Sequence, residues 1–251
     1  MKTLKLILLL SFASTFSRAQ DNVTHRSSFL SAGLIQIKES ANFGLVFKGP
    51  EINYGMIWDI KNKKNRINYE YGLGLGIILS REIPALGFYL KPVDFAYLFR
   101  LSPEESNLFI GPSLKCEYNY NLYPDLQAGF DYWFTNFSLG LTALYDFNYQ
   151  SSSFRMKLNS SLMGFVSRQP DYRNPYYYDI GFKHAIRHQH QDLTFGSLNS
   201  FNTTNFEILW KSNPESRFSI GYLLNYLGYY HNPEFKMVSH NIKIIINKKQ
   251  K

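Results

Sequence analysis

Side chains alternate between apolar and polar or very small with a period of two along most of this chain. Between Ile67 and Leu79 the odd-numbered residues are aliphatic or aromatic, whereas the even-numbered residues from Asn68 to Gly76 are polar or glycine. Successive side chains of a β-strand point to opposite faces, so the pattern predicts strands with one apolar and one polar face. A closed wall of such strands can separate two media of opposite polarity.

The alternation recurs in segments that are joined by short polar connections. Most of these segments reach the ~9–11 residues that a tilted strand needs to cross a membrane. We therefore predict an all-β fold, a closed antiparallel up-and-down transmembrane β-barrel of about 12 strands. The predicted strands are 28–38, 43–60, 67–80, 86–100, 108–120, 125–134, 137–149, 153–165, 177–187, 203–212, 216–229 and 236–247.

The second predicted strand changes phase along its length. Phe43, Leu45 and Phe47 share one parity, whereas the apolar residues of 52–60 have the other. A bulge or kink at Gly49-Pro50 would restore a single facing, and two short strands are the alternative.

The predicted connections divide between the two ends of the barrel. Short polar turns are expected at 62–65, 102–107, 135–136 and 212–216, on the periplasmic side together with both termini. The larger connections are expected at 166–176 on that side and at 188–202 on the outer side.

The first 19 residues have the features of a signal peptide. Lys2 and Lys5 precede the apolar run Leu6–Leu10, and Ser17-Arg18-Ala19 offers a small-x-small site with cleavage before Gln20. The apolar run is too short to span a bilayer as a helix. We expect residues 1–19 to be the leader and 20–251 to form one barrel domain, exported to the outer membrane of a Gram-negative cell.

Composition is consistent with a membrane wall and argues against other classes. Aromatic residues make up 17% of the chain and charged residues only 18%, which suits girdles of Tyr and Phe at the membrane interfaces. The net charge of +8 comes from scattered basic residues in an exported chain, so we expect contact with outer-membrane lipid or lipopolysaccharide and not with nucleic acid. Protein partners are not indicated. The one cysteine, Cys116, excludes an internal disulfide.

Charged residues on the predicted inward faces carry opposite signs in the two halves of the chain. Closing the barrel would bring the acidic early strands to face the basic later ones, and ion pairs across the lumen would follow. The network either fixes the barrel shape or lines a polar pore or solute pocket. Six inward glycines, Gly72, Gly74, Gly76, Gly111, Gly129 and Gly140, either leave local room or ease strand curvature. The predicted lumen-facing charged network is Glu51, Asp59, Glu70, Asp94, Glu117, Asp131, Asp146, Arg155, Lys157, Lys183, Lys211 and Lys243.

Sequence motifs for catalysis or cofactors are weak. His25-Arg26-Ser27 has the His-x-Ser spacing of lipid-hydrolysing barrels but lies before the first predicted strand. His184, His188 and His190 with Asp192 could bind a metal, although a polar loop is the simpler interpretation. We assign no catalytic residue, no metal and no cofactor.

The last 90 or so residues resemble uncharacterised exported barrel-type proteins of Bacteroidota. The similarity lies in Leu162-Met163-Gly164-Phe165, Pro170-x-Tyr172, the run Phe195–Ser200, Phe218-x-Ile220-Gly221-Tyr222-Leu223 and Ser239-His240-Asn241. The resemblance implies an outer-membrane location and no established activity. The chain departs from many outer-membrane barrels in ending on Ile246-Asn247-Lys248-Lys249-Gln250-Lys251 and not on an aromatic residue.

Three functions remain open from the sequence. The first is an integral outer-membrane barrel with an ion-paired interior and a structural, accessory or small-solute transport role. The second is a soluble periplasmic or secreted barrel that binds an apolar ligand, with the apolar faces pointing inward. The third is a lipid-acting barrel enzyme.

Overall fold

The computed structural model describes residues 23–40, 44–101, 107–124, 131–168, 193–213, 216–231 and 234–247. Among these residues no helix has both the length and the apolar character that crossing a membrane requires. The strands are β1 Val23–Glu39, β2 Val46–Lys61, β3 Asn65–Ser80, β4 Ile83–Arg100, β5 Leu108–Leu122, β6 Asp131–Tyr149, β7 Ser152–Arg168, β8 Thr194–Ser197, β9 Phe201–Lys211, β10 Phe218–Tyr229 and β11 Phe235–Asn247.

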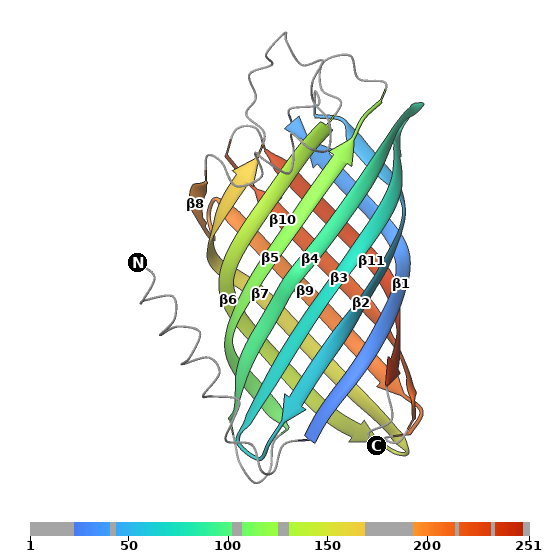
Figure 1. The fold of residues 1–251 in the computed structure, drawn as a ribbon, viewed down its shortest axis with the longest axis vertical. Coiled ribbons are helices and arrows are strands. Elements are labelled where there is room, and N and C mark those ends of the chain that lie inside the picture. Colours follow the sequence, from blue (N-terminus) through green and yellow to red (C-terminus); the bar gives the residue numbers. More distant parts are fainter. Residues whose placement is uncertain are drawn as a thin grey trace, which may run out of the picture.

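Ten of the described strands close into an antiparallel barrel (Figure 1). Their order is β6-β5-β4-β3-β2-β1-β11-β10-β9-β7, and β7 pairs with β6 to complete the ring. The short β8 pairs with β7 beyond the point where β9 leaves it, and lies outside the ring. Closure leaves no free sheet edge within the ring. The prediction of an all-β closed antiparallel barrel is confirmed, whereas the count of 12 strands is not.

Strand β6 accounts for one difference from the predicted count. The segments 125–134 and 137–149 were expected to be two strands, but Asp131–Tyr149 is a single strand. Thr135 and Asn136, the predicted turn, pair with β5 on one side and β7 on the other and are fully buried. Pairing on both sides outweighs the local turn preference of this dipeptide. The predicted strand 177–187 and residues 169–176 of the predicted connection 166–176 lie outside the described residues, whereas residues 166–168 belong to β7. The predicted connection 188–202 contains β8.

Strand β2 is regular through Gly49-Pro50, so the predicted bulge or break is wrong. Its pairing with β1 runs from Val46 to Lys61 without a shift. Phe47 is fully buried inside the barrel, whereas Ile52 is half exposed on the outside. The change of phase in the sequence therefore reflects an inner face that turns from polar to apolar along the strand.

The start of β1, the end of β11 and four of the strand connections lie at the same end of the barrel. Ser27, near the start of β1, pairs with Asn247, the last residue of β11, so both strands meet at what we call the terminal end. The connections β2–β3, β4–β5, β6–β7 and β9–β10 are also at this end, and β1–β2 and β3–β4 are at the opposite, far end. In the β2–β3 turn, the Asn62 side-chain oxygen accepts hydrogen bonds from the backbone N–H groups of Lys64 and Asn65.

The outer surface of the barrel is a band of aliphatic and aromatic side chains. Leu73, Leu139 and Ile242, on three different strands, are each more than half exposed. Toward the terminal end, Trp58 packs on Tyr69 and Tyr71, and Phe147 stacks between Tyr145 and Phe154. The inner surface carries the buried charged groups. This distribution is the reverse of the one in water-soluble proteins.

Candidate functional site

The far end of the lumen is filled by apolar side chains that point inward. Phe134 stacks on Phe235 with ring centroids 4.8 Å apart and meets Tyr229 edge-on at 5.7 Å. Phe47 makes an edge contact with Tyr123 at 4.7 Å. We call this group the far-end apolar cluster, and its members are Ile35, Ile37, Phe47, Ile78, Ala85, Tyr123, Tyr132, Phe134, Val166, Phe201, Leu227, Tyr229 and Phe235.

A central charge cluster crosses the lumen below these apolar side chains. Lys243 donates to Glu70 Oε2 at 2.9 Å and lies 2.7 Å from Glu207 Oε1. Lys91 donates to the other oxygen of Glu70 at 3.0 Å. The cluster consists of Glu70, Asp94, Glu117 and Glu207 with Lys91, Lys115, Lys157 and Lys243.

Other contacts of the central charge cluster cross the lumen between strands that are not neighbours in the ring. Lys157 on β7 lies 3.9 Å from Asp94 on β4 and donates to Asn68 at 2.7 Å. Lys115 on β5 donates to Asn205 on β9. Because an ionised group away from water is costly unless paired and hydrogen-bonded, these contacts hold the strands at a fixed separation.

A second group of ion pairs lies nearer the terminal end. Arg66 donates through Nε to Asp59 at 2.7 Å and through Nη1 to Asp146 at 2.6 Å. Arg155 contacts the same two carboxylates, at 3.1 Å and 2.8 Å. Each carboxylate thus lies between two guanidinium groups, an arrangement that the planar arginine fork suits. Lys61 lies 3.6 Å from Asp146 and completes this terminal charge cluster.

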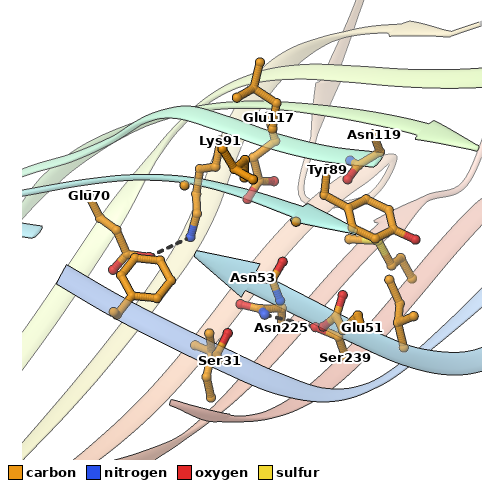
Figure 2. Close-up of a pocket in the computed structure, with 18 residues that line it drawn as sticks. Ser31, Glu51, Asn53, Glu70, Tyr89, Lys91, Glu117, Asn119, Asn225 and Ser239 are labelled. Carbon is orange, nitrogen blue, oxygen red and sulfur yellow. Dashed lines mark hydrogen bonds and ion pairs between the residues drawn. The ribbon is translucent and has the colours of Figure 1, made fainter. Parts of the chain in front are cut away.

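Two cavities lie between these layers. The larger, of about 360 Å³, is at the terminal end and is lined by both charge clusters together with His25, Ser27 and Lys211. The smaller, of about 90 Å³, lies between the central charge cluster and the far-end apolar cluster (Figure 2). The side chains of the described strands therefore fill the lumen at several levels and leave separate spaces.

One of the inward glycines makes room for a lumen side chain. A Cβ on Gly74 would lie 1.9 Å from Asn53 Oδ1 and 2.9 Å from its Cγ. Gly74→Ala is expected to lower the free energy of unfolding by about 1–3 kcal/mol through overpacking. In an Asn53→Ala background the same change should cost less, because both close atoms are gone. Equal costs in the two backgrounds, measured by urea titration, would show that the glycine serves strand curvature instead.

The structure describes ten of the twelve predicted lumen residues well enough to place their side chains. All ten lie on the inner face, in one of the two charge clusters or lining one of the two cavities. Lys183 and the side chain of Asp131 lie outside the described part. The ten residues are Glu51, Asp59, Glu70, Asp94, Glu117, Asp146, Arg155, Lys157, Lys211 and Lys243.

Sequence reasoning did not assign three cations, Lys61, Arg66 and Lys91, to the lumen, although all three take part in these clusters. Arg66 falls between the predicted turn 62–65 and the predicted strand 67–80, but it is the second residue of β3 and is buried. The side chains of Lys91 and Asp94 both point inward although the residues are three positions apart. The reason is that the pairing register of β4 with both β3 and β5 shifts between Leu90 and Asp94. Pro92, within a strand, was the available signal for this bulge.

The His25-x-Ser27 pair faces the lumen at the terminal end. Ser27 is buried, and its hydroxyl donates to Asn247 Oδ1 at 2.7 Å. The pair is therefore not on the outer face where lipid would lie. His184, His188, His190 and Asp192 lie outside the described residues. Within the described ranges, no group of three or more His, Cys, Asp or Glu side chains is arranged to hold a metal ion.

Comparison with known proteins gave matches only among solved structures. No family model and no curated protein matches the chain. The outer-membrane protease OmpT from Escherichia coli is 8% identical, covering 92% of this chain and 98% of its own, with a TM-score of 0.45. The translocator domain of the autotransporter NalP from Neisseria meningitidis is 7% identical over 97% and 95%, with a TM-score of 0.48. A COG4313 outer-membrane channel from Pseudomonas putida F1 is 10% identical over 90% and 95%, with a TM-score of 0.37.

Proposed function

We propose that this protein is an integral outer-membrane β-barrel whose filled lumen gives it a structural or accessory role. The observation that supports this most is the polarity of its two faces. Leu73, Leu139 and Ile242 are exposed outside, whereas Glu70, Lys115 and Lys243 are buried inside and paired. A water-soluble barrel would place these sets the other way round.

The ends of the barrel suggest its orientation in the membrane. The terminal end carries the short β2–β3 and β6–β7 turns and both terminal strands. Short turns of outer-membrane barrels are on the periplasmic side. The terminal charge cluster would then face the periplasm, and the far-end apolar cluster would lie toward the cell exterior. The predicted leader, residues 1–19, supplies the export that this location needs.

The membrane assignment predicts that the folded protein needs a detergent or a bilayer. We expect it to fractionate with outer membranes, to be extracted only by detergent, and to migrate differently on a gel when heated, because a closed barrel resists unfolding in mild detergent. Full solubility in buffer without detergent would instead support the soluble ligand-binding barrel.

The filled lumen predicts little passage of solutes. We expect the purified protein to give no steady current steps in planar bilayers and no sugar uptake in liposome swelling, because side chains occupy the lumen at the central charge cluster and the far-end apolar cluster. A 16–18-stranded porin, which leaves an aqueous channel, is the matched positive control. A reproducible open-state current would favour small-solute transport over the structural role.

A further inference from the structure

The smaller cavity lies deep in the barrel, and several polar side chains reach it through a lining that is otherwise mostly apolar. Ser31, Glu51, Asn53, Asn119 and Asn225 line it, and Figure 2 shows these side chains arranged around one space. These five residues come from four strands, β1, β2, β5 and β10, and Ser239 on β11 lines the cavity as well. The volume of about 90 Å³ corresponds to roughly three water molecules.

The carboxylate of Glu51 lines this cavity and takes no part in the ion pairs of the central charge cluster. In the central charge cluster, four carboxylates and four lysines balance. Glu51 is 6% exposed. Lys91 also lines the cavity but is paired with Glu70 and Asp94, and no described lysine, arginine or histidine nitrogen lies within 4.0 Å of the Glu51 carboxylate. That carboxylate accepts a hydrogen bond from Asn241 Nδ2 at 2.5 Å and is also hydrogen-bonded by the side chains of Ser239 and Asn53. A buried carboxylate without a cation is costly, so a positive ligand would be stabilised beside it.

Two further groups at the cavity have hydrogen-bonding capacity that the protein does not use. Ser31 Oγ and Asn119 Nδ2 are inaccessible and have no hydrogen-bond partner in the described structure. Their residues are 1% and 4% exposed, and both line the cavity. Buried polar atoms without a partner are uncommon in folded proteins, and where they occur together they mark the place of an unseen polar ligand or water.

We propose that this cavity binds a small monovalent cation, of ammonium or alkali-metal size, together with water. The carboxylate of Glu51 balances the charge, and the oxygens of Ser31 and Asn53 complete the shell. The Asn119 amide donates to an accompanying water. Hard cations favour such oxygen donors. A divalent ion would find only one uncompensated carboxylate, and the cavity is too small for a large organic cation.

The test uses the stability of the full chain, refolded in detergent and unfolded with urea. Ammonium, sodium and potassium chlorides are compared with choline chloride at equal ionic strength. Above the dissociation constant, each tenfold increase in the concentration of the free cation should raise the folding equilibrium constant about tenfold, and choline should have no such effect. The order of the three small cations identifies which of them the site prefers.

Variants separate a bound cation from general salt effects. Glu51→Gln should abolish the cation dependence and be at least as stable as the native chain in choline chloride. Glu234→Gln, which removes an exposed carboxylate paired with Lys236, should keep the dependence. If Glu51→Gln does not refold, Ser31→Ala keeps the charge and should weaken the response several-fold. An equal response to choline, or an unchanged response in the Glu51 or Ser31 variant, would overturn the proposal.

Discussion

Replacing Arg66 by methionine is expected to lower the free energy of unfolding by about 3–5 kcal/mol, because it leaves buried carboxylates with too few partners. Arg66 is 1% exposed and bonds to both Asp59 and Asp146. Arg155 contacts the same carboxylates, but its single guanidinium cannot also replace the hydrogen bonds that Arg66 donates to both of them. Two negative charges in the lumen would then share one guanidinium and Lys61.

Urea or guanidinium titration of the refolded barrel measures this loss. Lys236→Met is the matched control, since it breaks an exposed ion pair with Glu234 that should contribute no more than about 1 kcal/mol. Adding Asp59→Asn to Arg66→Met should recover part of the stability, because it removes a buried carboxylate that has lost its closest hydrogen-bonding partner. A loss no larger than that of Lys236→Met would mean that water reaches and solvates the terminal charge cluster.

The period-two pattern predicted most of the fold because facing is a local property of a strand. Glu70, Lys157 and Lys243 could be assigned to the lumen from the alternation alone, once the aliphatic residues that alternate with each of them in its strand were assigned to the outer face. The partners of these residues could not be predicted in the same way. Lys243 meets Glu70, which is 173 positions away in sequence, and that contact depends on the strand order and tilt of the closed ring.

The errors of the sequence reading share a physical cause. Thr135-Asn136 has the composition of a turn, and Gly49-Pro50 that of a bulge, but both are held in register by neighbours that are distant in sequence. The far-end apolar cluster was missed because the sequence analysis assumed a polar, hydrated lumen along the whole length of the barrel. Where the lumen is filled by Phe47 and Phe134, inward residues become apolar and parity no longer distinguishes the two faces.

Replacing Leu75 by arginine should lower the free energy of unfolding in a phospholipid bilayer by about 2–4 kcal/mol. Leu75 is half exposed on the outer face of β3, and its strand neighbours are Ile52 and Phe88, which are also exposed. In the proposed membrane orientation these side chains contact hydrocarbon. A guanidinium there must be carried away from water or draw water and headgroups toward it, and either is costly.

The same substitution distinguishes the membrane barrel from a soluble one, because exposure has opposite consequences in the two media. In water, an arginine at an exposed site should change stability by no more than about 0.5 kcal/mol. Gln36→Arg, on the outer face near the far end of β1, is the matched control and should cost about 0–1 kcal/mol in the bilayer because it lies at the rim. Guanidinium titration in lipid vesicles measures both variants. A large loss for Leu75→Arg with a small loss for Gln36→Arg requires a hydrocarbon layer around the middle of the barrel, whereas equal small losses would contradict it.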